Sequence, residues 1–351
     1  MEGPGAPRRI TLVSRVRRNS YVSLLCEGLR LAGLDPEVVE QFSLGWMWRN
    51  RRRVDVLHIH WLELLLVYPT LGRSLRRWLS VVLGLFVARH WHVCVVYTVH
   101  NIEPHEGQRA ALVRLGNQVM MALAQAVHVH DEGTAQLLAE RWGRRRGVYV
   151  IPHGSYVGAY PNTCTRAEAR QRLGLEEGAF VYLFLGRVRP YKGIEELLEA
   201  FRSLDDGDTV LLIAGEVHEP EYEQRVRELA AGDGRIRLSL RFVADEELQL
   251  FLNACDVCVL PYRHVTMSGA TMLSFSFGTP VVAPRMGCFT YLVGQGEERG
   301  VFYEAGGLAG ALRRARLSDL GAKRAACRDY VRSLDWETVA RQHAAMYAQC
   351  Q

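Results

Sequence analysis

Short runs of wholly apolar residues alternate along the chain with longer stretches in which apolar positions recur at helical spacing. Such runs are typical of strands buried on both faces, and strand–helix alternation predicts an α/β protein with parallel, doubly wound sheets. A first series of strands is expected at 9–14, 54–60, 93–99, 126–130 and 148–151. A second series is expected at 181–185, 209–214, 235–240, 257–260 and 280–283.

Between the two series the chain carries Gly, Pro and Asn residues and then a short charged helix, which is typical of a hinge between domains. A length of 351 residues suits two domains of ordinary size better than one. We therefore expect a first Rossmann-like domain over 1–155, a second over 156–334 and a C-terminal helix over 335–351.

Charge and cysteine content narrow the class of protein. A net charge of +5 is too weak to indicate nucleic-acid binding. The eight cysteines are scattered among apolar runs, and Cys255 and Cys258 have no second pair at zinc-ribbon spacing, so we expect a reduced, cytoplasmic protein. The first nine residues lack the apolar core of a signal peptide, and the apolar run 79–88 is too short to span a bilayer.

The stretch 181–199 joins a buried strand to a helix through a basic loop. Gly186 ends the strand, Arg187, Arg189 and Lys192 supply charge, and Gly193 precedes apolar residues at helical spacing. Lys192 is one of only two lysines in the chain. A basic loop at a helix N-terminus after a parallel strand favours anion binding, and the alternative is a charged loop that faces solvent.

The pattern Gly-Arg-x-x-x-x-Lys-Gly resembles the diphosphate-binding signature of GT-B glycosyltransferases, above all family four and the related exopolysaccharide β-mannosyl and glucuronosyl transferases. The resemblance implies that Arg187 and Lys192 neutralise the diphosphate of a nucleotide-sugar donor. It also implies the GT-B fold, in which two Rossmann-like domains face a cleft and the last helix, here 336–349, crosses back to the first domain.

A second loop follows the strand at 257–260 and matches the first. Gly269 allows backbone amides to approach a phosphate closely, and the helix from Ala270 supplies a positive dipole end. The alternative is a simple turn with an N-cap. The candidate donor-binding residues are Arg187, Lys192, His153, Arg263, Ser268, Gly269, Ala270 and Thr271. For His153, a turn at the domain junction is an equal alternative.

The sequence departs from family four at two carboxylates. The family's Glu-x7-Glu ahead of Gly-x-Pro-Val-Val is replaced here by Val265 and Leu273. We therefore leave the donor as GDP-mannose or a UDP-sugar. The Asp-x-Asp at 206–208 precedes a strand, which is the wrong end of the sheet for a metal site, so we expect no metal and assign charge neutralisation to Arg187 and Lys192.

Acceptor chemistry is expected in the first domain, at the carboxyl ends of its strands. The segment 98–106 resembles the N-domain loop of such enzymes, and the family's sugar-contacting histidine maps onto His100. Inversion of configuration needs a base, for which His100, His105 and Glu106 are the candidates. Asn19 and Tyr21 are candidate acceptor residues. His58 and His60 are interpreted as histidines of the core or of the sheet end.

Two apolar segments, 62–68 and 78–87, are separated by Arg73, Arg76 and Arg77. This mixture suits a surface that dips into a membrane to reach a lipid-linked sugar. A buried helix hairpin is an equal alternative. With the first interpretation we expect peripheral contact with the inner face of the cell membrane.

The sequence as a whole predicts a metal-independent glycosyltransferase that moves a sugar from a nucleotide diphosphate to a glycan or lipid-linked acceptor, and it favours inversion of configuration over retention. Two alternatives stay open. One is a GT-B sugar-nucleotide epimerase. The other, suggested by the missing carboxylates, is a non-catalytic subunit that binds a nucleotide sugar.

Overall fold

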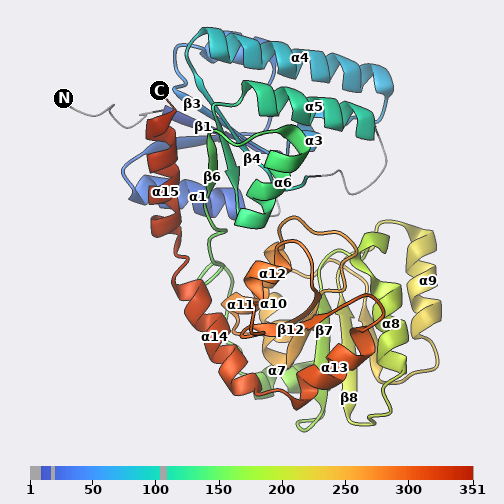
Figure 1. Cartoon of the computed structure of the whole chain (residues 1–351). Helices are drawn as coiled ribbons and strands as arrows, with labels where there is room; N and C mark the ends of the chain where they lie inside the picture. The colour runs from blue at the N-terminus through green and yellow to red at the C-terminus, as the bar shows by residue number, and fades with distance from the viewer. Residues whose placement is uncertain (1–8, 17–19, 103–108, 351) are drawn as a thin grey trace. The chain divides into compact units, whose positions relative to one another are not determined.

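A computed structural model describes residues 9–16, 20–102 and 109–350 of the chain (Figure 1). The chain divides into two compact units. Unit 1 comprises Met1–Gly154 with Leu334–Gln351, and unit 2 comprises Ser155–Ser333. The C-terminal helix is therefore part of the same unit as the first half of the chain.

Unit 1 contains a parallel sheet with the strand order β2-β1-β3-β4-β5-β6. Its strands are β1 (Arg9–Val13), β2 (Asp35–Val39), β3 (Val56–His60), β4 (Cys94–Thr98), β5 (Ala126–Val129) and β6 (Val148–Val150). The apolar pattern of the sequence did not predict β2. Its sequence, Asp-Pro-Glu-Val-Val, carries residues that strands disfavour, and its position at the edge of the sheet is where proline is tolerated.

Helices cover both faces of this sheet because alternate strand residues point to opposite sides. Leu12, Val56 and Val96 pack with α1 (Tyr21–Leu31) and α15 (Trp336–Gln349), which lie against each other. Leu57 and Val95 pack on the other side, with α4 and α5 (Figure 1). The remaining helices of unit 1 are α2 (Leu44–Asn50), α3 (Leu62–Leu66), α4 (Leu71–His90), α5 (Ala110–Leu123) and α6 (Glu132–Trp142).

Unit 2 contains a second parallel sheet with the order β12-β11-β10-β7-β8-β9. Its strands are β7 (Phe180–Leu185), β8 (Thr209–Ala214), β9 (Ile236–Ser239), β10 (Val257–Val259), β11 (Val281–Pro284) and β12 (Gly300–Tyr303). β12, a four-residue edge strand that begins with glycine, was not predicted from the sequence.

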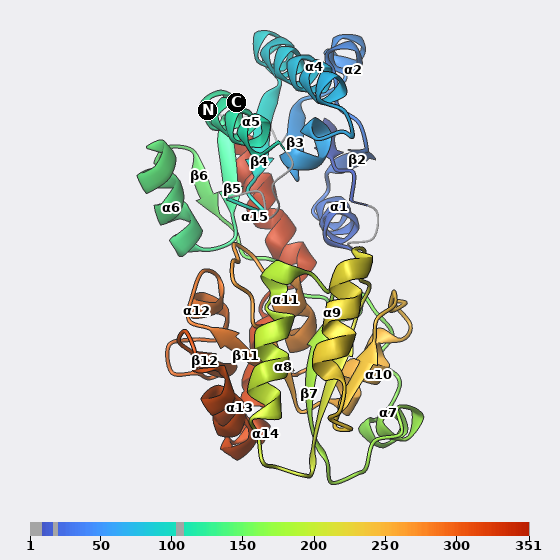
Figure 2. The same ribbon diagram turned by 90° about the vertical axis from the view of Figure 1, so that its right-hand side faces the viewer.

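The sheet of unit 2 is also covered by helices, and Figure 2 shows α8 and α9 side by side. The helices are α7 (Arg166–Arg172), α8 (Ile194–Arg202), α9 (Pro220–Ala230), α10 (Leu248–Ala254), α11 (Gly269–Ser276), α12 (Phe289–Leu292), α13 (Leu308–Leu317) and α14 (Leu320–Arg332), with a 3-10 turn η1 (Pro190–Lys192). In both units, none of the described helices is long and apolar enough to cross a membrane.

Candidate active site

The first phosphate-loop candidate follows β7, the buried strand at the centre of the unit 2 sheet. Gly186 turns the chain with φ +139°, and Arg187 is exposed. Within the described part of the chain Arg187 has no hydrogen-bond or ion-pair partner for its guanidinium group. Its positive charge is therefore available to an anionic ligand.

Gly193 fixes how this loop meets the next one. It caps α8 with φ +71°, and a Cβ at this position would lie 1.9 Å from the carbonyl oxygen of Pro261. Only glycine permits this approach. The N–H of Arg263 donates to the carbonyl of Tyr191 at 2.9 Å. The loop after β7 and the loop after β10, which are about seventy residues apart in sequence, are thus held together by backbone contacts.

Lys192 lies at this junction. Its Nζ is 3.4 Å from the centroid of the buried Tyr262 ring and 5.1 Å from that of Tyr191. Among the described residues it forms no ion pair with a carboxylate. Burial lowers the pKa of Lys192 to about 7, because desolvation disfavours the charged form. A ligand phosphate would supply the counter-charge that the protein does not.

The second loop ends at the N-terminus of α11. Ser268 is the N-cap and accepts from the Thr271 N–H at 3.2 Å, while the Thr271 hydroxyl donates to Ser268 Oγ at 2.9 Å. Both side chains are buried, so they perform the capping role that the sequence analysis gave as the alternative. The amides of Gly269 and Ala270, in the first turn, have no hydrogen-bond partner within the described residues. These two amides form the positive end of α11. They, rather than the two hydroxyls, are the donors that this helix end offers to an anion.

The other residues of this loop are less constrained. Arg263 is exposed and lies 3.8 Å from Glu195, which also lies 3.4 Å from Arg225. Val265 and Leu273 are partly buried apolar residues at the positions where family four has its carboxylates. Unit 2 therefore presents the cations of Arg187 and Lys192 and the N-terminus of α11. Such an arrangement can bind a diphosphate.

The Asp-x-Asp of the sequence lies at the amino end of β8. Arg316 pairs with both acids, at 2.9 Å from Asp206 and 2.6 Å from Asp208. Both acids thus have the same arginine as their partner. Over the described ranges, no group of three or more His, Cys, Asp or Glu residues has the geometry to hold a metal ion.

Unit 1 gathers aromatic and histidine side chains at the carboxyl ends of its strands. The buried ring of Tyr21, from α1, has four imidazoles around it, with centroids 5.8, 5.2, 5.6 and 4.8 Å away for His60, His100, His130 and His153 respectively. His60, His100 and His130 follow or end three adjacent strands, as the topology of a parallel sheet requires.

His100 is held by two neighbours. His60 Nδ1 lies 3.1 Å from His100 Nε2, so one of these nitrogens donates to the other. The Trp61 indole stacks on the His100 ring, with centroids 3.8 Å apart and planes at 6°. Trp61 itself has φ +46°, an unfavourable backbone conformation for a bulky residue. The chain accepts this strain at the position that orients His100.

A second, deeper set of histidines continues the cluster. His58 is 2.8 Å from the Tyr347 hydroxyl and 2.7 Å from that of Thr98, and Thr98 is 2.9 Å from His128. His343 on α15 bonds its own helix backbone at 2.9 Å. Seven histidines of unit 1 are buried: His58, His60, His100, His128, His130, His153 and His343. Burial lowers the pKa of all seven. The pKa falls to about 3 for His60 and to about 4 for His153 and His343. It is also well below the usual value in His58, His100, His128 and His130.

One carboxylate near His100 was missed by the sequence analysis. Glu63, in the first turn of α3, accepts a hydrogen bond from Asn101 Nδ2 at 3.1 Å. Burial raises the pKa of Glu63. The signal was present in the sequence as a lone acid within the apolar run Leu62–Leu66, directly after the histidine-bearing strand.

Three candidates of the sequence analysis, Asn19, His105 and Glu106, lie outside the described residues. His153, which was expected to contact the donor, lies in unit 1 and packs against Tyr21 and His130, with its Nδ1 2.7 Å from the Gly154 carbonyl. His60 is a buried histidine at the end of β3, in agreement with its interpretation as a histidine of the core or of the sheet end, and it belongs to the same cluster.

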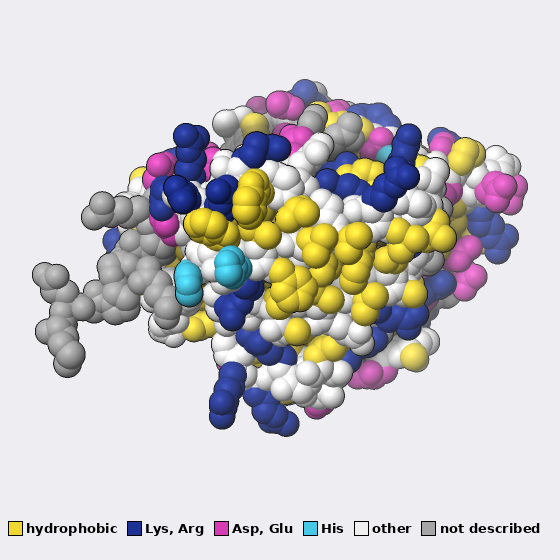
Figure 3. Space-filling view, turned by 90° about the horizontal axis from the view of Figure 1, so that it is seen from above, with side chains coloured by type: hydrophobic (Ala, Val, Ile, Leu, Met, Phe, Trp, Pro, Cys, Tyr) yellow, Lys and Arg dark blue, Asp and Glu magenta, His cyan; other side chains and the backbone are white. Residues whose placement is uncertain are grey.

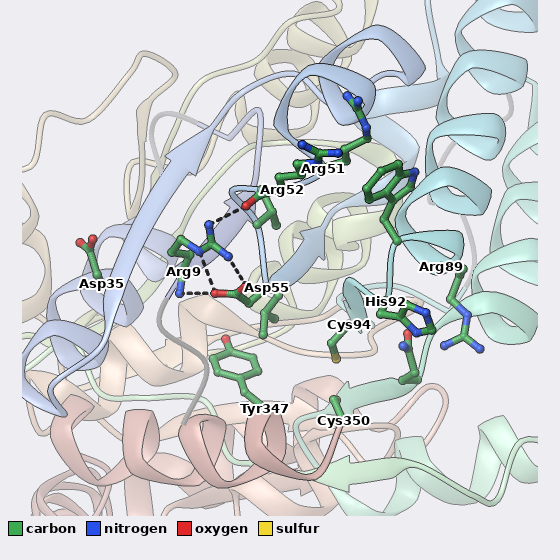
Figure 4. Close-up of a pocket in the computed structure, with 14 residues that line it drawn as sticks. Arg9, Asp35, Arg51, Arg52, Asp55, Arg89, His92, Cys94, Tyr347 and Cys350 are labelled. Atoms are coloured by element: carbon green, nitrogen blue, oxygen red, sulfur yellow. Dashed lines mark hydrogen bonds and ion pairs between the residues drawn. The ribbon is translucent and has the colours of Figure 1, made fainter. Parts of the chain in front are cut away.

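A cavity of about 1300 Å³ lies at the amino ends of the unit 1 strands, opposite the ends that carry the histidines (Figure 4). Arg9, at the start of β1, and Asp55 both line it and form a two-pronged ion pair with each other. Cys94, at the start of β4, also lines it. Ligands of such sheets bind at the carboxyl ends of the strands, so we assign the transfer chemistry to the histidine edge and not to this cavity.

Sequence comparison identifies relatives of known type. The family model for glycosyl transferases group 1 matches residues 165–333. The GDP-mannose:glycolipid 4-beta-D-mannosyltransferase of Xanthomonas campestris pv. campestris is 29% identical over 297 residues, covering 80% of this chain and 74% of that protein. A D-inositol 3-phosphate glycosyltransferase of Geodermatophilus obscurus is 28% identical over 297 residues, covering 77% and 64%.

Solved structures share the fold of the whole chain. Sucrose-phosphate synthase from Thermosynechococcus elongatus superposes with a TM-score of 0.75 at 20% identity, covering 97% of this chain and 98% of that one. HepE of Anabaena in complex with UDP gives 0.75 at 16% identity, covering 97% and 100%. WaaG, a glycosyltransferase of lipopolysaccharide biosynthesis, gives 0.70 at 13% identity, covering 96% and 99%.

The two parallel sheets with their helices thus form the GT-B fold. Residues 165–333 form a glycosyl transferases group 1 domain, and the chain is similar over most of its length to named glycosyltransferases.

Proposed function

We propose that the protein transfers a sugar from GDP-mannose or a UDP-sugar to a glycan or lipid-linked acceptor, without a metal ion and with inversion of configuration. GDP-mannose is the first donor to test, because the relative from Xanthomonas is named for it and is similar over most of both chains. The name of that relative also supports a glycolipid acceptor.

The observation that carries the donor side is the joint between the two loops of unit 2. Lys192 lies over Tyr262 without a carboxylate partner among the described residues, and Arg187 is equally unpaired there. When the donor bond breaks, negative charge develops on the departing diphosphate. Two cations and the amides of Gly269 and Ala270 would stabilise that charge, as a metal ion does in other sites.

On the acceptor side, we propose that His100 orients the transferred sugar and that the base lies nearby. A strongly lowered pKa makes His100 a weak proton acceptor, since an effective base has a pKa near the working pH. A carboxylate therefore suits the role better. Of the candidates, Glu106 and His105 stay proposals outside the described residues, and Glu63 holds Asn101 beside His100.

A panel of nucleotide sugars tests this function. A ligand present at about 100 times its dissociation constant adds ~2.7 kcal/mol of stability, which a thermal-shift assay detects. We expect GDP-mannose to stabilise the protein more than GMP or mannose does, because only the diphosphate engages both cations. Incubation with the stabilising donor and a lipid-linked acceptor should then yield product and free nucleoside diphosphate. Absence of any stabilisation across the panel would contradict the proposal, and tight binding without turnover would favour a non-catalytic subunit.

A further inference from the structure

Helix α4 is apolar on two opposite faces. Its core side buries Ser74, Val81, Leu85 and Ala88. Its outer side carries Leu71, Leu75, Leu79, Leu83 and Phe86, each 40% to 56% exposed. The spacing of four, four, four and three residues puts these five side chains in one row along the helix. We call this row the α4 apolar face.

The apolar face continues onto neighbouring helices. Leu64 on α3, Leu115 on α5 and Trp48 on α2 are also exposed, and each of these helices packs against α4. Figure 3, seen from above Figure 1, shows a continuous band of hydrophobic side chains with Lys and Arg side chains on either side. Single exposed hydrophobic residues are ordinary, but a band of this extent marks an interaction surface.

The charge around the band has one sign. Helices α2, α4 and α5 contain no Asp or Glu, and the one acid of α3, Glu63, is bonded to Asn101. Arginines that are exposed on these helices and have no carboxylate partner in the described structure are Arg49, Arg73, Arg76, Arg89 and Arg114. An apolar strip flanked by arginines complements a bilayer with anionic headgroups, because the strip enters the acyl boundary while the cations meet the lipid phosphates.

The position of the face links it to the acceptor edge. α3 follows the carboxyl end of β3, which carries His60, and the short segment 67–70 joins α3 to α4. Arg15, just beyond the carboxyl end of β1, donates to the Leu64 carbonyl at 2.7 Å and to the Tyr68 hydroxyl at 3.2 Å. Leu64 and Leu71 thus lie near the carboxyl ends of the strands, where the histidine cluster is located.

We propose that the α4 apolar face docks unit 1 onto a bilayer that contains anionic lipid, so that a lipid-linked acceptor reaches the His100 edge without leaving the membrane. The purpose of this docking rests on the proposed function, whereas the docking itself does not need the donor. Of the two alternatives from the sequence, the buried hairpin describes only the inner face of α4, because the outer face is exposed. Membrane contact through that outer face stays a proposal.

Vesicle flotation of the purified full-length chain tests the proposal. We expect the protein to float with vesicles of phosphatidylcholine and phosphatidylglycerol and to bind vesicles of phosphatidylcholine alone at least tenfold less. The double variant Leu75→Glu/Leu79→Glu should bind the mixed vesicles at least tenfold less than wild type. The matched control Leu31→Glu/Leu317→Glu changes two leucines that are exposed elsewhere, on α1 and at the end of α13, and should bind as wild type does.

Two further measurements separate the outcomes. Arg73→Gln/Arg76→Gln should weaken binding by about fivefold for each arginine, since one cation near an anionic surface is worth ~1 kcal/mol. The affinity of every variant for GDP should equal that of wild type, which shows that the fold and the donor site are intact. Wild-type protein that does not float, or a Leu75→Glu/Leu79→Glu variant that floats normally, would overturn the membrane proposal and leave the transfer reaction standing. Self-association without lipid that the same variant abolishes would also overturn it, in favour of a protein partner.

Discussion

The Nζ atom of Lys192 lies 3.4 Å from the centroid of the Tyr262 ring, and this contact joins the loop after β7 to the loop after β10. The aromatic face holds the ammonium group in position, but it does not neutralise the charge as a carboxylate would. Burial consequently lowers the pKa of Lys192 to about 7.

Donor affinity should therefore depend on pH. Only the protonated lysine attracts a diphosphate, so the apparent dissociation constant for GDP should rise as Lys192 loses its proton above pH 7, by up to about tenfold per pH unit. Isothermal titration with GDP between pH 6 and 8.5 measures this. In Lys192→Arg the charge persists across that range, and the dependence should largely disappear. An equal dependence in wild type and Lys192→Arg would contradict the prediction.

Acid should destabilise unit 1 before unit 2. The folded-state pKa is about 3 for His60 and about 4 for His153 and His343, below the unfolded value near 6.5. Between these values the unfolded chain binds more protons, so stability is complete above pH 6.5 and falls as the pH drops. At pH 5 each of the three histidines should cost on the order of 2 kcal/mol.

Unit 2 provides the internal control, since its two histidines, His218 and His264, are not buried. Hydrogen exchange at pH 7.5 and pH 5 should show a loss of protection in the strands of unit 1 and little change in those of unit 2. Uniform loss in both units, or none in unit 1, would refute the interpretation.

The identity of the base can be tested with two carboxylates. Glu106→Gln should lower turnover by about 10²–10⁴-fold with donor affinity unchanged, the size of a general-base contribution. Glu63→Gln should cost less than tenfold, because a glutamine oxygen still accepts from Asn101. Proton NMR of the fresh product should show the anomeric configuration opposite to that of the donor. A retained configuration, or a larger loss in Glu63→Gln than in Glu106→Gln, would reject this assignment.

Removal of divalent cations should leave transfer unchanged. Arg187 and Lys192 are proposed to stabilise the leaving diphosphate, and the acids at 206 and 208 are already paired with Arg316. The initial rate in excess EDTA is the measurement, with added magnesium and manganese as the reverse test. A strict requirement for either cation would contradict the proposal.

The alternation of apolar runs and helices predicted the class of both sheets, because each central strand is buried on two faces and carries a continuous apolar signal. Two of the four edge strands, β2 and β12, escaped prediction. β2 contains Pro and Glu, which strands disfavour, and β12 is only four residues long and begins with Gly. The motif at Gly186–Gly193 could be found in the sequence, because the backbone there requires glycine at fixed positions and the basic residues lie at fixed spacing between them.

The side-chain partners within the site were not predictable in the same way. Nothing local to Lys192 indicates that Tyr262, seventy residues away, lies beneath its ammonium group. His60 ends a strand that is buried on both faces. Only the pairing of β3 with β4 brings its Nδ1 to 3.1 Å from His100 Nε2. The outer face of α4 was ambiguous for a related reason, because an apolar helix with arginines gives the same pattern when buried as when exposed.

The affinity of GDP for loop variants tests the donor site most directly. Arg187→Ala and Lys192→Ala should each weaken binding by about 10–100-fold, since a charge-assisted hydrogen bond to phosphate contributes roughly 1.5–3 kcal/mol. Arg332→Ala, an exposed arginine of unit 2 on α14, is the matched control and should bind GDP as wild type does. All three variants should unfold at the wild-type temperature. Wild-type affinity in both Arg187→Ala and Lys192→Ala would contradict the assignment of the diphosphate to these loops.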